Sequence, residues 1–106
     1  YLAHLRHAPE VVLLVSACDK LHNAQAIVRD LENPAVGQKV FGRFKGGTDG
    51  TLGYYQSLVD VFTDRKTTVA SQLGAIVGRM HRLAGKHEQS GLPGSFRVES
   101  VNRNDD

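Results

Sequence analysis

An aspartate and an asparagine lie one helical turn apart in an apolar stretch near the start of the chain. Residues 16–23 read SACDKLHN, with Asp19 and Asn23 four positions apart. In a helix these side chains are about 6 Å apart along the axis and share a face, so both can contact one ligand. A carboxylate in apolar surroundings needs a compensating charge. The pattern therefore indicates either a cation bound by Asp19 or an ion pair of Asp19 with Lys20 or Arg6.

The periodicity around these residues predicts one long helix from about Glu10 to Leu31 or Glu32. At about 100° per residue, one apolar face should form the core, and it consists of Leu13, Ala17, Leu21, Ala24, Val28 and Leu31. Roughly opposite lies a polar stripe of Ser16, Asp19, Asn23, Ala26 and Asp30. Asp30 is about 16 Å from Asp19, so we interpret it as a surface or ion-pair residue. Further apolar residues on the flank, Val11, Val15 and Cys18, predict that the first half of the helix is enclosed, with Cys18 as a small buried residue.

The other segments predict an all-α fold, a helical bundle, because no stretch alternates with the period of two that a half-buried strand shows. A short helix should end near His7. After Asn33-Pro34 a glycine-rich loop is expected over residues 33–50, anchored on the core by Val40, Phe41 and Phe44. A third helix should run to about Asp64.

A fourth helix is predicted between Lys66 and Gly85, with an apolar stripe from Val69 to Leu83 that indicates a helix–helix contact. We expect residues 1–87 to form the helical domain. Residues 88–106 are rich in Gly, Ser, Asn and charged residues and predict a flexible tail.

Composition limits the classes of partner. The formal net charge of the 106 residues is +2, and no basic run is interleaved with aromatic residues, so nucleic-acid binding is not expected. The longest apolar run, residues 11–15, is far shorter than the ~20 residues of a membrane span. A single cysteine excludes an internal disulfide framework and favours a cytoplasmic location.

Two side chains outside the long helix are candidates for contact with a phosphorylated ligand. Arg43 lies in the segment RFKGG, which offers cations and backbone amides but lacks the spacing of a phosphate-binding loop. Tyr54 lies next to Tyr55, which falls on the core stripe of its helix. Tyr54 either reaches a ligand with its hydroxyl or is merely half-buried.

The strings VSACDKLHNA at 15–24, IVRDL at 27–31, FGRF at 41–44 and LGYY at 52–55 resemble the C-terminal half of bacterial HD-domain phosphohydrolases, nearest the guanosine tetraphosphate (ppGpp) hydrolases. The resemblance implies an HD-domain-like helical fold that binds one divalent ion, Mn²⁺ or Mg²⁺, through a His, an adjacent His-Asp pair and a later Asp. Asp19 matches that later Asp, and Asn23 matches an asparagine that faces the bound nucleotide. Lys20, Arg43 and Tyr54 are further candidates for substrate contact.

The chain lacks the other ligands of this set, because no His-Asp dipeptide occurs in its 106 residues. The resemblance therefore places them before Tyr1, in a missing N-terminal half of the same domain, and this chain alone should be inactive. Ala26 stands where the ppGpp hydrolases tend to carry a hydroxyl residue, which leaves other phosphoester substrates open. The alternative is a non-catalytic interaction module that pairs with a second copy through the Val69–Leu83 stripe.

Overall fold

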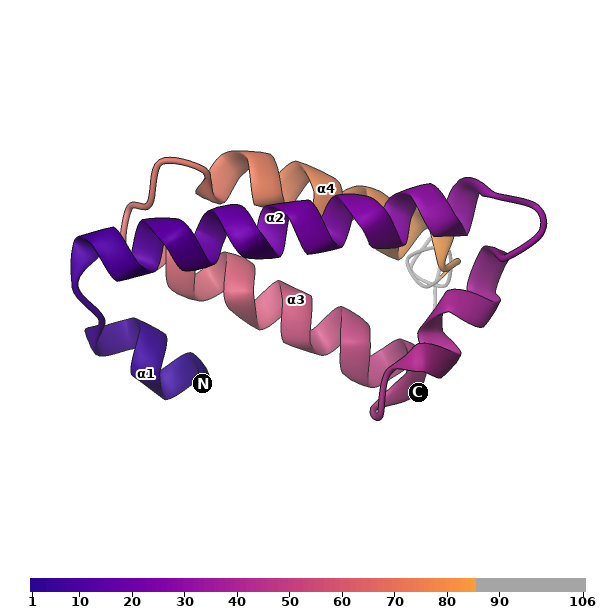
Figure 1. Ribbon diagram of the computed structural model, residues 1–106, viewed down its shortest axis with the longest axis horizontal. Helices are drawn as coiled ribbons and strands as arrows, with labels where there is room; N and C mark the ends of the chain where they lie inside the picture. The colour runs from indigo at the N-terminus through magenta and orange to yellow at the C-terminus, as the bar shows by residue number, and fades with distance from the viewer. Residues whose placement is uncertain (86–106) are drawn as a thin grey trace, which may run out of the picture.

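A computed structural model describes residues 1–85 of the chain. All regular elements in this part are helices, which confirms the all-α prediction. In chain order they are α1 (Leu2–His7), α2 (Glu10–Glu32), the 3₁₀ helix η1 (Gly37–Arg43), α3 (Gly47–Asp64) and α4 (Ala70–Leu83) (Figure 1). The tail predicted for residues 88–106 lies outside the described residues.

The long helix α2 spans the molecule, and the other elements gather on one side of it. It packs along α4, while α3 packs against α4 and contacts α2 (Figure 1). The 3₁₀ helix η1 closes the far end against α2 and α3, and α1 contacts α3. The largest fully buried side chains of the shared core are Phe41, Phe62, Leu5, Leu58, Leu73 and Met80.

The ends of α2 follow from local sequence. Pro9 occupies the N-cap, where its missing N–H costs no helical hydrogen bond. At the other end Asn33 is extended, as expected for a residue before proline, and its side-chain oxygen accepts a hydrogen bond from the Ala35 N–H at 3.0 Å. These ends match the predicted helix.

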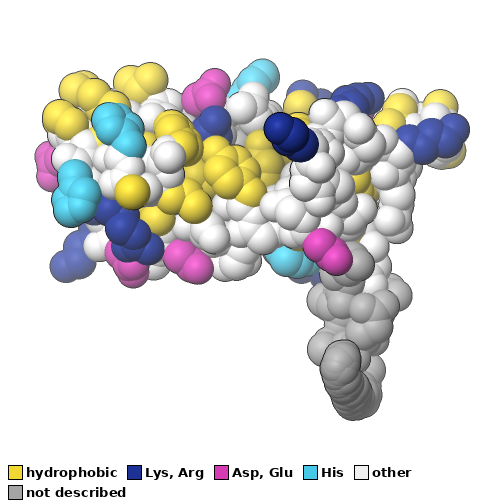
Figure 2. All heavy atoms as spheres, turned by 90° about the horizontal axis from the view of Figure 1, so that it is seen from below, with side chains coloured by type: hydrophobic (Ala, Val, Ile, Leu, Met, Phe, Trp, Pro, Cys, Tyr) yellow, Lys and Arg dark blue, Asp and Glu magenta, His cyan; other side chains and the backbone are white. Residues whose placement is uncertain are grey.

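The core face of α2 matches the prediction at Leu13, Ala17, Ala24 and Val28, which are all buried. Enclosure of its first half was predicted wrongly. Within residues 1–85, Val11 is 70% and Val15 66% exposed, and Cys18 is exposed as well. The reason is that α3 and α4 cover a single side of the helix. Figure 2 shows hydrophobic side chains on the surface at the left end of the molecule, where α2 begins.

The glycine-rich stretch is more regular than predicted, because it contains η1 and the start of α3 at Gly47. Val40 and Phe41 are buried as expected, but Phe44 is 37% exposed and does not anchor the loop. Phe44 follows the end of η1 with an extended backbone, and its side chain does not pack on the core that Phe41 helps to fill.

The apolar stripe of α4 is used inside the chain. Leu73, Val77 and Met80 are buried, with at most 1% exposed, where α4 meets α2 and α3. The stripe therefore forms a helix–helix contact, as predicted, but it is not available for pairing with a second copy.

One described helix, α2, is long and apolar enough to cross a membrane by length and composition alone. A core helix can meet the same criteria, but among residues 1–85 only 28% of the apolar window of α2 is buried. The prediction of no membrane partner stays a prediction.

Candidate functional site

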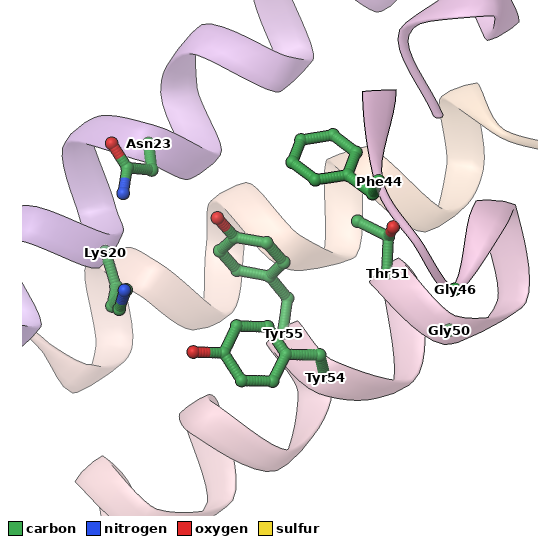
Figure 3. Close-up of a pocket in the computed structure, with 8 residues that line it drawn as sticks. All are labelled: Lys20, Asn23, Phe44, Gly46, Gly50, Thr51, Tyr54 and Tyr55. Atoms are coloured by element: carbon green, nitrogen blue, oxygen red, sulfur yellow. The ribbon is translucent and has the colours of Figure 1, made fainter. Parts of the chain in front are cut away.

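Three of the predicted site residues, Lys20, Asn23 and Tyr54, line one cavity of about 380 Å³. The cavity lies between α2 and the N-terminal half of α3 (Figure 3). Its remaining lining residues are Phe44, Gly46, Gly50, Thr51 and Tyr55. Residues more than 30 positions apart in sequence thus meet at one site.

The walls of the cavity follow from helical spacing. Lys20 and Asn23 are three positions apart on α2, and Thr51 and Tyr55 are four apart on α3, so each pair lies on one helix face. Figure 3 shows the hydroxyls of Tyr54 and Tyr55 pointing toward α2, where Lys20 and Asn23 lie. Polar groups from both helices therefore converge on the cavity.

Glycines form the turn that leads into α3. A Cβ on Gly46 would lie 3.0 Å from the Cα of Gly50, which is tighter than most real Cβ contacts and would require the backbone to shift slightly. Gly47 has a φ of +66°, in the left-handed region that glycine adopts without steric cost. The turn after Phe44 therefore depends on its glycine residues.

Asp19 lies beside the cavity but is not buried, because its side chain is 62% exposed. Its carboxylate accepts a hydrogen bond from Asn23 Nδ2 at 3.5 Å, and Lys20 Nζ lies 3.7 Å away. The predicted ion pair with Lys20 is thus present, whereas Arg6 pairs with Asp64 at 3.4 Å. A carboxylate in contact with water needs no compensating charge, so the burial argument for a bound cation was wrong.

A divalent metal ion fits this group only in part. Asp19 offers a hard carboxylate, and the Asn23 carboxamide can turn its oxygen toward the same point. Within residues 1–85, no group of three or more His, Cys, Asp or Glu side chains could hold a metal ion. Asp19 and Asn23 could therefore offer two oxygen ligands at most, which is too few to hold a divalent ion in a defined geometry.

Lys20 is the cation nearest the cavity. Its side chain is only 19% exposed, and Nζ lies 5.0 Å from the centroid of the Tyr1 ring, a cation–π contact. Together with the Asp19 carboxylate, this contact holds the ammonium group at the edge of the site. A phosphate group in the cavity would be attracted by it.

The phenol of Tyr55, on α3, interacts electrostatically with the carboxylate of Asp19, on α2. Burial raises the pKa of its phenol above the ordinary value of 10.0, and the neighbouring Tyr54 and Asp19 raise it further. Its ring meets that of Tyr54 edge to face, with centroids 5.5 Å apart. Tyr55 is therefore a neutral phenol at physiological pH.

Arg43 does not line this cavity. Its guanidinium donates a hydrogen bond to Asp30 at 2.7 Å, which confirms Asp30 as an ion-pair residue. Both line a second, neighbouring cavity of about 240 Å³, which shares Asn23, Phe44 and Tyr55 with the first. Arg43 and Lys20 therefore line different, neighbouring cavities.

Sequence reasoning missed Phe44 and Thr51 as lining residues. The glycines at positions 46, 47 and 50 were a signal for a turn next to these residues. Thr51 is only 5% exposed, and its hydroxyl has no hydrogen-bond partner among the residues that the structure describes. No sequence pattern indicates that burial.

Comparison of the chain with models of known protein families, with curated proteins and with solved structures gives no significant match. The fold and the site are therefore interpreted from their own geometry.

Proposed function

We propose that this chain is part of a cytoplasmic, HD-type metal-dependent phosphohydrolase that cleaves a phosphoester or pyrophosphate of a nucleotide, with ppGpp among the candidate substrates. The observation that carries the proposal is the cavity beside Asp19, where Lys20, Asn23 and Tyr54 converge. A carboxylate next to a cation, a carboxamide and a phenol is a combination suited to binding a phosphorylated ligand beside a metal ion.

In this proposal Asp19 supplies one ligand to Mn²⁺ or Mg²⁺. Such an ion, when bound, polarises a phosphoryl oxygen and lowers the pKa of a coordinated water. Lys20 attracts the phosphate, and Asn23 binds the substrate without adding negative charge. Tyr54 contacts the substrate from α3, while Arg43, held by Asp30, acts from the neighbouring cavity.

The exposed apolar side of α2 supports the idea that further helices of the same domain cover this face. Val11, Val15, Asp19 and Asn23 follow one another at intervals of four and form a single ridge along the helix. Val11 and Val15 are exposed aliphatic side chains that favour burial, so a helix packed on them would lie next to Asp19. We propose that the missing His and His-Asp ligands come from such helices, encoded before Tyr1.

The test uses the protein with the residues encoded before Tyr1 included. With Mn²⁺ it should release phosphate or pyrophosphate from a nucleotide, and Asp19→Ala should abolish that release. Asp60→Ala is the matched control, because Asp60 is an exposed carboxylate on α3 that, within residues 1–85, accepts a hydrogen bond from its neighbour Gln56 at 3.3 Å and from no other side chain. Full activity in Asp19→Ala would overturn the proposal.

The exposed face of α2 also favours the alternative, a non-catalytic module that pairs with a second copy. Since the Val69–Leu83 stripe is internal, Val11 and Val15 would form the contact. This alternative predicts an oligomer in analytical ultracentrifugation that chelators leave unchanged. A monomer at all concentrations would exclude it.

A further inference from the structure

Two exposed aromatic side chains border the cavity beside Asp19. Phe44 and Tyr54 each leave 37% of their surface open to solvent, and both line the cavity. In Figure 3, Phe44 and the two tyrosines border one side of it, opposite Lys20 and Asn23. Aromatic rings left open at a concave site favour a flat, apolar-faced ligand, since stacking then removes both surfaces from water.

The glycine turn beside these rings widens their access. Gly46 and Gly50 line the cavity without side chains, and a Cβ on Gly50 would meet nothing within 4 Å, so a ligand can approach the backbone at Gly50. The volume of about 380 Å³ is within the range of small-molecule sites. The cavity thus has space for a ring system larger than a phosphate group.

The opposite wall offers hydrogen bonds suited to the edge of such a ring. Asn23 gives one amide hydrogen to Asp19, which leaves one N–H and the carboxamide oxygen for a ligand. A donor beside an acceptor matches the edge of a nucleobase. Lys20, at the other end of this wall, suits an attached phosphate.

We propose that this cavity binds the heteroaromatic base of a nucleotide, with Phe44 and Tyr54 as stacking surfaces and Asn23 as the group that recognises the base edge. The inference rests on the proposed function for the expectation of a nucleotide. It assigns a role to Phe44, and it separates a base end at Phe44 from a phosphate end at Lys20.

The test uses the 106-residue chain without metal and follows backbone amide signals by NMR. The probes are adenosine and guanosine, which carry a base without phosphate, and ribose 5-phosphate, which carries phosphate without a base. A nucleoside should shift the signals of Phe44, Gly46 and Tyr54, and ribose 5-phosphate should leave them unchanged. Shifts of these signals by ribose 5-phosphate alone would overturn the proposal.

Variants then assign the contact. Phe44→Ala should weaken nucleoside binding about 5- to 150-fold, the effect of losing one base–aromatic stacking contact. Phe44→Trp should keep the affinity for the nucleoside, because the larger ring retains a stacking surface. Leu14→Ala is the control, since Leu14 is similarly exposed, at 42%, and lies outside this cavity. Unchanged affinity in Phe44→Ala would refute the assignment.

These results are separable from hydrolysis. If the longer protein hydrolyses a phosphoester but the chain binds no nucleoside, the base site is wrong and the proposed function stands. If the chain binds nucleosides through Phe44 but Asp19→Ala keeps full hydrolytic activity, the base site stands and the metal role of Asp19 falls.

Discussion

Replacing Thr51 by valine should stabilise the protein. Thr51 is 5% exposed on α3, and its hydroxyl finds no hydrogen-bond partner within residues 1–85. A buried hydroxyl left unpaired costs about 1–3 kcal/mol, and Thr and Val have similar helix propensities. Because valine keeps the branched shape and removes the unpaired group, we expect Thr51→Val to raise the free energy of unfolding by about 1 kcal/mol.

The assay is urea unfolding followed by circular dichroism, together with a thermal scan. For a domain of this size, about 1 kcal/mol corresponds to a rise in Tm of about 4–8 °C. Thr63→Val is the matched control, because Thr63 lies exposed on the same helix and should change stability by no more than about 0.5 kcal/mol. A loss of about 1 kcal/mol or more in Thr51→Val would mean that the hydroxyl has a partner, such as a buried water, and would refute the reasoning.

Three other predictions concern the site and the exposed face of α2. The pKa of Tyr55 is raised in the folded state, so Tyr55 ionises first in the unfolded chain, and the free energy of unfolding should fall as pH rises above 10. In urea unfolding between pH 9 and 11, this free energy should fall less in Tyr55→Phe than in the unchanged protein. Since the Asp19 charge contributes to that shift, Asp19→Asn should lower the pKa of Tyr55 in an absorbance titration at alkaline pH, and an unchanged pKa would contradict the coupling. Val15→Ser should leave the unfolding free energy of the chain within about 0.5 kcal/mol, whereas Leu13→Ser, at a position 3% exposed, should cost several-fold more; equal losses in denaturant unfolding would show that the Val15 side chain is covered.

Helical periodicity was sufficient to predict the class of fold and most of the helix ends. Pro9 and Asn33-Pro34 set the limits of α2 through local backbone chemistry, which a sequence carries in full. The core face of α2 was also readable, because Leu13, Ala17, Ala24 and Val28 repeat at helical spacing. Short-range patterns therefore carried this part of the prediction.

The exposure of individual side chains to solvent could not be predicted from helical periodicity. The apolar residues Val11 and Val15 predict burial from their type alone, but burial depends on which elements pack on that side of the helix. Phe44 was similarly assigned to the core, although it borders a cavity. Both errors concern contacts between distant segments, which a pattern within one helix does not specify.

The candidate site was predicted in part. Asn23 and Lys20 were chosen by spacing and family resemblance, and with Tyr54 they line one cavity; Arg43 is held by Asp30 beside a different one. Gly46, just before α3, and Gly50, in its first turn, line the cavity, and the approach of α3 to α2 there is a long-range effect with no periodic signal.

The uncovered side of α2 has a thermodynamic consequence. Anything that binds Val11 and Val15 in the folded chain, and not in the unfolded one, adds its binding free energy to the stability of the whole bundle. The Tm of the helical bundle then depends on the bound partner and on the concentration of that partner. α2 packs along α4 and contacts α3, and these helices share a single core that unfolds cooperatively. A ligand bound to the outer surface of α2 would therefore also raise the unfolding free energy of the contacts on its inner surface.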